Sequence, residues 1–184
     1  MRTKLLEQEL TDDVVSLEEA MEHSRITDDW DELVVQACLD AAHDAVQSWL
    51  NRKLYPSLMV GQVNEYRTRI TLPYPPIKAV SYVTAECANG DTIDLVEGTD
   101  WKFDSISETI RFLKPQPNLS VFEFQYECGY ESVESVPKAV KHAILMTFAT
   151  LYNNREDAVV GASVASVPLT AHRLLRTHRV RGHI

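Results

Sequence analysis

The sequence predicts an α+β fold: a small helical bundle with an inserted antiparallel β module and an extended C-terminal arm. Three observations support this fold class. Residues 14–55 carry polar and apolar side chains at helical spacing, residues 60–130 are rich in Thr, Val, Ile, Tyr and Phe, and residues 136–157 are again helical in pattern. Because the flanking helices must come together to bury their apolar faces, we expect the β segment to be an insertion between them.

Length and composition allow one large domain or two small ones. The chain has 184 residues, of which 45% are hydrophobic and 24% charged, and no segment is long and apolar enough to cross a bilayer. Its three cysteines, Cys38, Cys87 and Cys128, form no C-x-x-C pair, which argues against a disulfide framework and a zinc site. The first ten residues do not resemble a signal peptide, so we expect a reducing cytoplasm as the compartment.

The net charge of −9 is unevenly distributed along the chain. Residues 1–48 hold thirteen acidic and three basic residues, a net of −10, whereas residues 161–184 hold four arginines and no acid. Because phosphate contacts need Lys and Arg, the acidic body disfavours general binding to nucleic acid. The basic end can still reach an acidic partner.

Two helices are predicted before residue 55, after a loosely held N-terminal arm at residues 1–13. Ser16 and Glu19 have the spacing of a capping box, which predicts a short helix to about Ser24. A longer helix is predicted from about Asp29 to Asn51, with acids at the positive end of its dipole. Its polar face is expected to carry Gln36, Asp40, His43, Asp44 and Gln47. Its buried face is expected to carry Trp30, Leu33, Val34, Ala37, Ala41 and Trp49.

Six strands are predicted in the β module. Asn89-Gly90 has the composition of a tight hairpin turn, and prolines and glycines separate the other segments. The strands are Val63–Leu72, Ala79–Ala85, Thr92–Leu95, Trp101–Asp104, Thr109–Phe112 and Ser120–Cys128.

Residues 136–157 are predicted to form the central helix. Pro137 suits its first turn, because the N–H that proline lacks would have no partner there. From Ala143 to Tyr152 the apolar side chains point all round the axis, so a core on one side cannot bury them. We expect the subunit's own core on one side and a second element or a neighbouring copy on the other. A central helix of an ordinary monomer fits the same pattern.

The end of the chain is predicted to be a basic arm. Residues 158–167 are small and weakly structured, and Pro168 is expected to open a short helix from Leu169 to Arg176. The last residues, from His172 to Ile184, are basic and end without a cap, which indicates an exposed arm.

An acidic cluster before the long helix is a candidate metal site. It lacks the twelve-residue ligand spacing and the sixth-position glycine of an EF-hand loop, and a capped helix start explains the same residues more simply. The cluster consists of Asp28, Asp29, Asp31 and Glu32.

A second acidic group faintly resembles the arrangement with which some nucleases hold a divalent ion. It consists of Asp91 or Asp94, followed by Asp100 and Lys102. Such triplets arise by chance in a charged β segment, and the surroundings are acidic where a nuclease should be basic. The motifs of nucleotide-binding proteins and hydrolases do not occur, so we predict no catalytic residue, no metal and no cofactor.

Five segments follow one another in a recognisable order. They are SLEEAMEHSRITDDWDELVVQACLDAAHDAVQSWLNRKL, LPYPPIKAVSYV, FEFQYECGY, VPKAVKHAILMTFATLYNNRED and VPLTAHRLLRTHRV. In this order, and with the Y-x-N-R-E pattern that closes the central helix, they resemble the head–tail connector (adaptor) family of long-tailed bacteriophages and prophages. The resemblance covers the chain from about Val15 to Val180. The residues before Val15 look like an extension beyond the family's usual core.

The resemblance implies a structural virion protein without enzymatic activity. Such a protein forms a ring, commonly of twelve subunits, beneath the portal at the capsid vertex. The ring extends the channel for double-stranded DNA without sequence-specific contacts, and it offers a docking surface to the next neck or tail protein. The implied location is the head–tail neck, after assembly in the host cytoplasm and without a membrane. A stopper or tail-terminator ring is the nearest alternative, and a small metal-dependent nuclease is a more distant one.

The resemblance also assigns roles to parts of the chain. Residues 14–168 would form the connector domain, with residues 169–184 as the basic C-terminal helix and arm, and the β region would face the lumen or the tail side. The central helix and Asp29–Asn51 would form the subunit core and the ring contacts. Within the central helix, the subunit contacts would involve Ile144, Phe148, Leu151, Tyr152 and Arg155. Portal docking would involve Leu169, Arg173, Leu174, Leu175, Arg176, Arg179 and Arg181 of the C-terminal arm.

Overall fold

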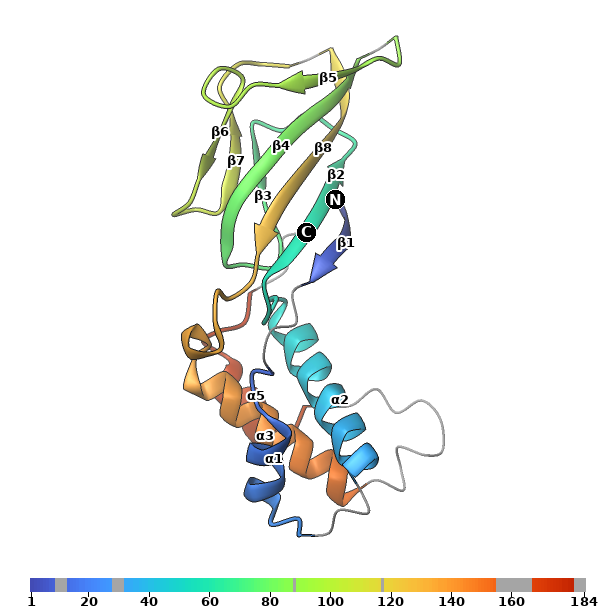
Figure 1. Cartoon of the computed structure of the whole chain (residues 1–184). Coiled ribbons are helices and arrows are strands. Elements are labelled where there is room, and N and C mark those ends of the chain that lie inside the picture. Colours follow the sequence, from blue (N-terminus) through green and yellow to red (C-terminus); the bar gives the residue numbers. More distant parts are fainter. Residues whose placement is uncertain (9–12, 28–31, 88, 117, 155–166, 181–184) are drawn as a thin grey trace. The chain divides into compact units, whose positions relative to one another are not determined.

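A computed structural model describes residues 1–8, 13–27, 32–87, 89–116, 118–154 and 167–180 (Figure 1). This part of the chain divides into two compact units, and its helices and antiparallel sheets confirm the α+β class. The first unit, called the β unit below, contains residues 1–8 and 55–131. The second, called the helical unit, contains residues 13–54 and 132–180.

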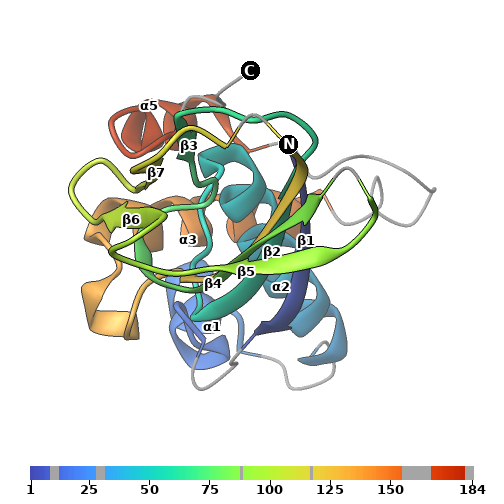
Figure 2. The same cartoon turned by 90° about the horizontal axis from the view of Figure 1, so that it is seen from above.

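The β unit contains two antiparallel sheets. The larger has the strand order β1-β2-β8-β4-β5, which can be followed in Figure 1, and Figure 2 shows the same unit from above. Its strands are β1 (Arg2–Gln8), β2 (Ser57–Val63), β4 (Ile77–Cys87), β5 (Thr92–Leu95) and β8 (Leu119–Cys128). The smaller sheet has the order β3-β7-β6, with strands β3 (Arg69–Thr71), β6 (Trp101–Asp104) and β7 (Thr109–Phe112).

The core of the β unit is built on β8, the middle strand of the larger sheet. From Phe122 to Cys128 every second residue of β8 is buried, including Phe124 and Tyr126, because successive side chains of a strand point to opposite faces. Gly61 on β2 pairs with Phe124, and a Cβ at Gly61 would clash with the ring of Phe124. Glycine therefore lets the aromatic ring lie directly over the neighbouring backbone.

The turns of the β module separate the strands largely as predicted. The bounds of β5, β6 and β7 agree with the predicted ones, and the Asn89-Gly90 hairpin is confirmed. The N–H of Gly90 donates to the carbonyl of Cys87 at 2.9 Å, and Gly90 has a φ of 88°, which favours glycine. The predicted strand Val63–Leu72 is wrong, because β2 ends at Val63 and β3 begins only at Arg69.

Residues 2–8 form a strand and not a loosely held arm. β1 pairs antiparallel with β2, with Thr3 opposite Gly61 and Leu5 opposite Met59. Most of its side chains are exposed, which is why the sequence resembles a solvated arm. An edge strand is held mainly by backbone hydrogen bonds to its neighbour, and these leave little trace in composition.

The helical unit contains α1 (Leu17–Ser24), α2 (Glu32–Leu50), α3 (Lys138–Asn153) and α5 (Leu169–Leu175). The predicted capping box opens α1: the hydroxyl of Ser16 accepts from the N–H of Glu19 at 3.1 Å, and the carboxylate of Glu19 accepts from the N–H of Ser16 at 3.0 Å. Pro137 is the N-cap residue of α3, one position before the first turn in which it was predicted. The predicted start of the long helix at residues 28–31 lies outside the described residues.

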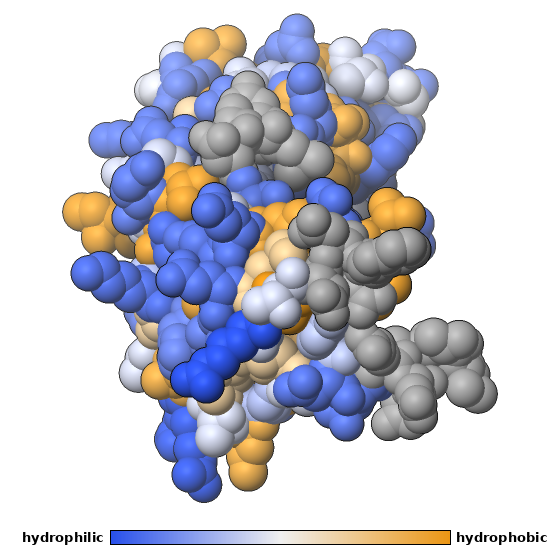
Figure 3. All heavy atoms as spheres, turned by 60° about the horizontal axis from the view of Figure 1, so that its bottom comes forward, coloured by the Kyte–Doolittle hydropathy of each residue, from blue (hydrophilic) through white to orange (hydrophobic). Residues whose placement is uncertain are grey.

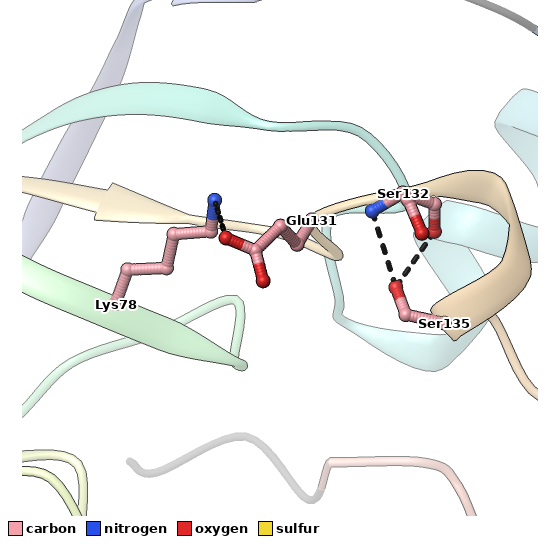
Figure 4. Close-up of polar contacts among 4 residues, drawn as sticks. All are labelled: Lys78, Glu131, Ser132 and Ser135. Carbon is pink, nitrogen blue, oxygen red and sulfur yellow. Dashed lines mark hydrogen bonds and ion pairs between the residues drawn. The ribbon is translucent and has the colours of Figure 1, made fainter.

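Polar contacts are made by residues next to the point, between residues 131 and 132, at which the chain leaves the β unit and enters the helical unit (Figure 4). In the β unit, the ammonium of Lys78 on β4 lies 3.4 Å from a carboxylate oxygen of the exposed Glu131. In the helical unit, the hydroxyl of Ser135 donates to the carbonyl of Ser132 at 2.6 Å and accepts from its N–H at 3.2 Å. These serine contacts form the turn η2 (Val133–Ser135) that leads into α3.

The buried face of α2 differs from the predicted one. Leu33 is 88% exposed, and Val34 and Ala37 are exposed as well, whereas the predicted polar residue His43 is buried. α2 has apolar side chains on two adjoining sides. The side that faces the core is the one whose side chains recur every three or four positions along the whole helix. The buried residues are Val35, Cys38, Leu39, Ala42, His43, Val46 and Leu50.

Candidate functional site

The central-helix residues proposed for subunit contacts separate into two groups. Ile144 and Phe148 are fully buried, because α3 packs against α1, α2 and α5 of the same unit. These two residues therefore belong to the core of the helical unit, although the predicted apolar run to Tyr152 is not fully covered within it. A neighbouring copy on its other side stays a prediction. Leu151 and Tyr152 are only partly buried, and the ring of Tyr152 stacks on that of Phe148 at a centroid distance of 6.0 Å. Arg155 lies outside the described residues.

The C-terminal segment is docked on the end of α2 and is not an exposed arm up to Val180. The ring of His172 stacks on the indole of Trp49 at a centroid distance of 4.9 Å. The guanidinium of Arg179 lies over the same indole, 4.8 Å from its centroid. Trp49, which the sequence places on the buried face of α2, is thus partly covered by the C-terminal segment.

Hydrogen bonds fix the same segment to the residues that end α2. The N–H of Val180 donates to the carbonyl of Leu50 at 2.9 Å, and the side-chain amide of Asn51 donates to the carbonyl of Val180 at 3.1 Å. The guanidinium of Arg52 donates to the carbonyl of His178 at 2.6 Å. Because the last carbonyl groups of a helix have no partner within the helix, the C-terminal segment satisfies one that α2 leaves open.

α5 presents a basic and apolar outer side. Ala171 and Leu175 are fully buried and anchor the helix to the unit, so Leu175 is a core residue and not a docking residue. Leu169 is 69% exposed. Arg181 lies outside the described residues. The exposed members of the predicted docking set, called the C-terminal basic surface below, are Leu169, Arg173, Leu174, Arg176 and Arg179.

Sequence reasoning missed an exposed apolar face at the start of α2. Leu33, Val34 and Ala37 are exposed and follow one another at helical spacing. The sequence could have indicated this face. The apolar side chains from Val35 to Leu50 form a longer stripe, and the three residues lie on another side of the helix. On the face of the molecule in Figure 3, hydrophobic side chains stand in separate patches among hydrophilic ones.

The acidic residues weighed as a metal site hold turns of the β unit. The carboxylate of Asp100 accepts from the N–H of Val96 at 3.0 Å, and its other oxygen lies 3.8 Å from the ammonium of Lys114. Asp91 accepts from the side-chain amide of Asn89 at 2.6 Å. In the described part of the chain, no group of three or more His, Cys, Asp or Glu side chains is arranged to hold a metal ion.

Two further predictions concern the first acidic cluster and membrane-spanning segments. Asp28, Asp29 and Asp31 of the first acidic cluster lie outside the described residues. Among the helices that the structure describes, none combines the length and the apolar character that a membrane span requires.

The chain is similar to known proteins in its structure, but its sequence matches no family model and no curated protein. The structure is similar to a chain in the neck of an empty gene transfer agent (GTA) particle computed with C6 symmetry, with a TM-score of 0.74 and 18% identity. It is also similar to a chain in the virion of the native particle, with a TM-score of 0.73 and 19% identity.

A third similar structure is the neck of the native GTA particle computed with C12 symmetry, with a TM-score of 0.71 and 19% identity. Each of the three alignments covers 100% of this chain and 98% of the other chain. The fold is therefore shared over the whole of this chain and nearly all of each similar chain.

Proposed function

We propose that this chain is a head–tail connector (adaptor), a structural protein that forms a ring in the neck of a phage-like particle. The observation that supports this most strongly is the similarity of fold over the whole chain to proteins from the neck and virion of a gene transfer agent particle. The similarity extends over the folds of both units and not over one common small domain. The order of sequence segments that resembles the connector family supports the same function independently.

In this function, twelve copies form a ring that docks beneath the portal and extends the DNA channel. The C12 symmetry with which one similar neck was computed supports this number. A chain with a net charge of −9 suits a channel wall, because double-stranded DNA must pass without being held by phosphate contacts. The opposite end of the ring would receive the next neck or tail protein.

The C-terminal basic surface is the part of the chain that we assign to the portal. It carries three exposed arginines on an otherwise acidic chain, and Leu169 and Leu174 add apolar area. Arginine and exposed apolar side chains are typical of the residues that dominate protein interfaces. Because Ala171 and Leu175 anchor the same helix in the core, the surface is presented in a fixed position.

Electron microscopy and native mass spectrometry of the purified chain, with and without the portal protein of the same phage, test the function. We expect a ring of twelve copies bound to the portal. A chain that stays monomeric and unbound next to assembled portal would contradict the proposal. A stopper or tail-terminator ring would assemble but would bind neck or tail proteins in place of the portal.

Charge reversal tests the portal surface without removing core residues. We expect Arg173→Glu together with Arg176→Glu to weaken portal binding at least tenfold and to leave the fold intact, because both side chains are exposed. Arg67→Glu together with Lys138→Glu is the matched control, since it changes the net charge equally at other exposed positions. Equal binding by the two double variants would remove the assignment. Truncation at Leu169 is a poorer test, because it deletes the buried Leu175 and uncovers Trp49.

A further inference from the structure

The larger sheet of the β unit has two open edges. β1 lies at one end of the strand order and β5 at the other, and in the part of the chain that the structure describes no strand pairs with the outer side of either. An open edge presents unpaired N–H and C=O groups, and it pairs readily with another strand. The two edges belong to one sheet, so β5 of a second copy can pair with β1 of the first.

The two edges carry opposite charges. β1 has Arg2 and Lys4 in its first half, with Glu7 as its only acid. The segment around β5, residues 91–98, has Asp91, Asp94 and Glu97 and no basic residue. Contact between β1 and β5 of two copies therefore brings opposite charges together, whereas contact between two β5 strands brings like charges together.

The pairing register places these charges on one face of the sheet at one level. Arg2 is opposite Gln62, Gln62 is opposite Glu123, Glu123 is opposite Thr84, and Thr84 is opposite Asp94. Residues directly opposite one another point to the same face. Arg2 and Asp94 are thus the two ends of a single cross-strand row. If the sheet of a second copy continues this row, its Arg2 lies beside Asp94 of the first copy. If the register between the two copies is shifted by two residues, Lys4 of the second copy lies there instead.

Each edge also exposes large apolar side chains. Leu5 and Leu6 of β1 are exposed, and so are Ile93 of β5 and Val96 after it. A neighbouring strand would cover part of this area, which gives the contact a hydrophobic contribution in addition to backbone hydrogen bonds.

The direction of the strands fixes the geometry of the contact. Four successive antiparallel pairs separate β1 from β5, so the two strands run in the same direction. Rotation about a ring axis by the small angle between neighbours in a large ring nearly preserves this direction. Joining one copy's β5 to the next copy's β1 is then a parallel pairing, and it is a head-to-tail contact of the kind that closes into a ring.

We propose that β5 of each subunit pairs in parallel with β1 of the next, so that the larger sheets of neighbouring subunits join into a continuous sheet around the ring. The occupant of each open edge is a second copy of this chain. This inference rests on the proposed ring, and it assigns residues of the β unit to the subunit contact.

Cysteine cross-linking in the assembled ring tests the pairing. In a Cys87→Ser background, we expect Arg2→Cys combined with Asp94→Cys, or Lys4→Cys combined with Asp94→Cys, to give a ladder of covalent oligomers up to the full ring on mild oxidation. The better-linked pair identifies the register, because disulfides require Cβ atoms about 3.5–4.5 Å apart. The matched control pairs Arg2→Cys with Ile106→Cys, which is 95% exposed in the turn after β6 and should not link.

A charge exchange gives a second readout. Asp94→Arg alone should lower the fraction of chain in rings, and Arg2→Glu with Lys4→Glu in the same chain should restore it. Rings that form without a cross-link from either pair, and that tolerate Asp94→Arg, would overturn the sheet pairing and leave the proposed function standing. If the wild-type chain forms no ring beside the portal, both the pairing and the proposed function fail.

Discussion

His43 is a buried titratable residue between α2 and the segment that precedes α1. Its Nε2 accepts from the N–H of Val15 at 3.3 Å, and its Nδ1 lies 3.0 Å from the carbonyl of Leu39, to which it donates. Burial lowers the pKa of His43 below 6.5, although a hydrogen bond to Leu39 and the nearby carboxylates of Asp13, Asp40 and Asp44 oppose the shift. The neutral imidazole is therefore the form that fits the folded chain.

This shift predicts that the free energy of unfolding falls as the pH drops below about 6.5. Between the lowered pKa of the folded state and the unfolded value of 6.5, the unfolded chain binds a proton that the folded chain does not. Urea unfolding followed by circular dichroism at pH 7.5 and 5.5 measures the loss. We expect His43→Gln to reduce this pH dependence, whereas the exposed His142→Gln should retain it. An unchanged pH dependence in His43→Gln would show that other groups cause it.

Trp49 connects the C-terminal segment to α2 through contacts on its indole ring. A stacked pair and a cation–π contact contribute about 0.5–1.5 and about 0.5–1 kcal/mol at such sites. We therefore expect Trp49→Ala to release the segment locally and to speed trypsin cleavage after Arg173 and Arg176 several-fold. Trp49→Phe keeps an aromatic face and should stay close to the wild-type rate. Mass spectrometry of the fragments measures the effect, and equal rates for both variants would contradict the role of the ring.

At the scale of whole elements, the sequence predicted the bounds of strands better than the buried side of a helix. The strands from Thr92 to Phe112 are short runs between turn residues, and local turn chemistry decides their ends. The buried face of α2 could not be predicted as reliably, because the helix has apolar residues on more than one side. The packing partners, which no local pattern reveals, decide which stripe is buried.

The two predicted arms show the same limitation. Residues 2–8 are held by pairing with β2, and residues 169–180 are held by Trp49 and the end of α2. Both contacts join segments that are far apart in the sequence. Of the candidate sites, the exposed arginines near the C-terminus could be predicted from charge, but Leu175 could not be separated from them without knowledge of which side of α5 is buried.

α3 allows folding and assembly to be tested separately. Leu151 is half-buried near the end of the helix, next to the exposed Thr150. We expect Leu151→Asp to leave the helical unit folded and to lower the fraction of chain in rings, because a charge opposes burial against a neighbour. Thr150→Asp places the same charge one residue away, at an exposed position, and is the control. Native mass spectrometry measures the ring fraction. Intact rings from Leu151→Asp would exclude this part of α3 from the subunit contact.

At the scale of the whole molecule, each unit has its own hydrophobic core. The β unit buries a cluster around Phe122, Phe124 and Tyr126, and the helical unit buries Ile144 and Phe148 with the inner side of α2. Neither unit is continuous in sequence, since the chain passes from one to the other between residues 8 and 13 and again near residues 54 and 131. Two parts of a chain that have separate cores can open independently of each other.

Separate cores predict that a core substitution destabilises mainly its own unit. Phe148→Ala and Phe122→Ala each remove a fully buried ring, at a cost of about 3–5 kcal/mol. Hydrogen exchange with mass spectrometry should then show exchange that is roughly a hundredfold faster or more in α2 and α3 for Phe148→Ala, with β2 and β8 little changed. Phe122→Ala should give the converse pattern. Acceleration of both units by either substitution would show instead that the two cores unfold as one cooperative structure, and a ring built from such subunits could not open in one unit alone.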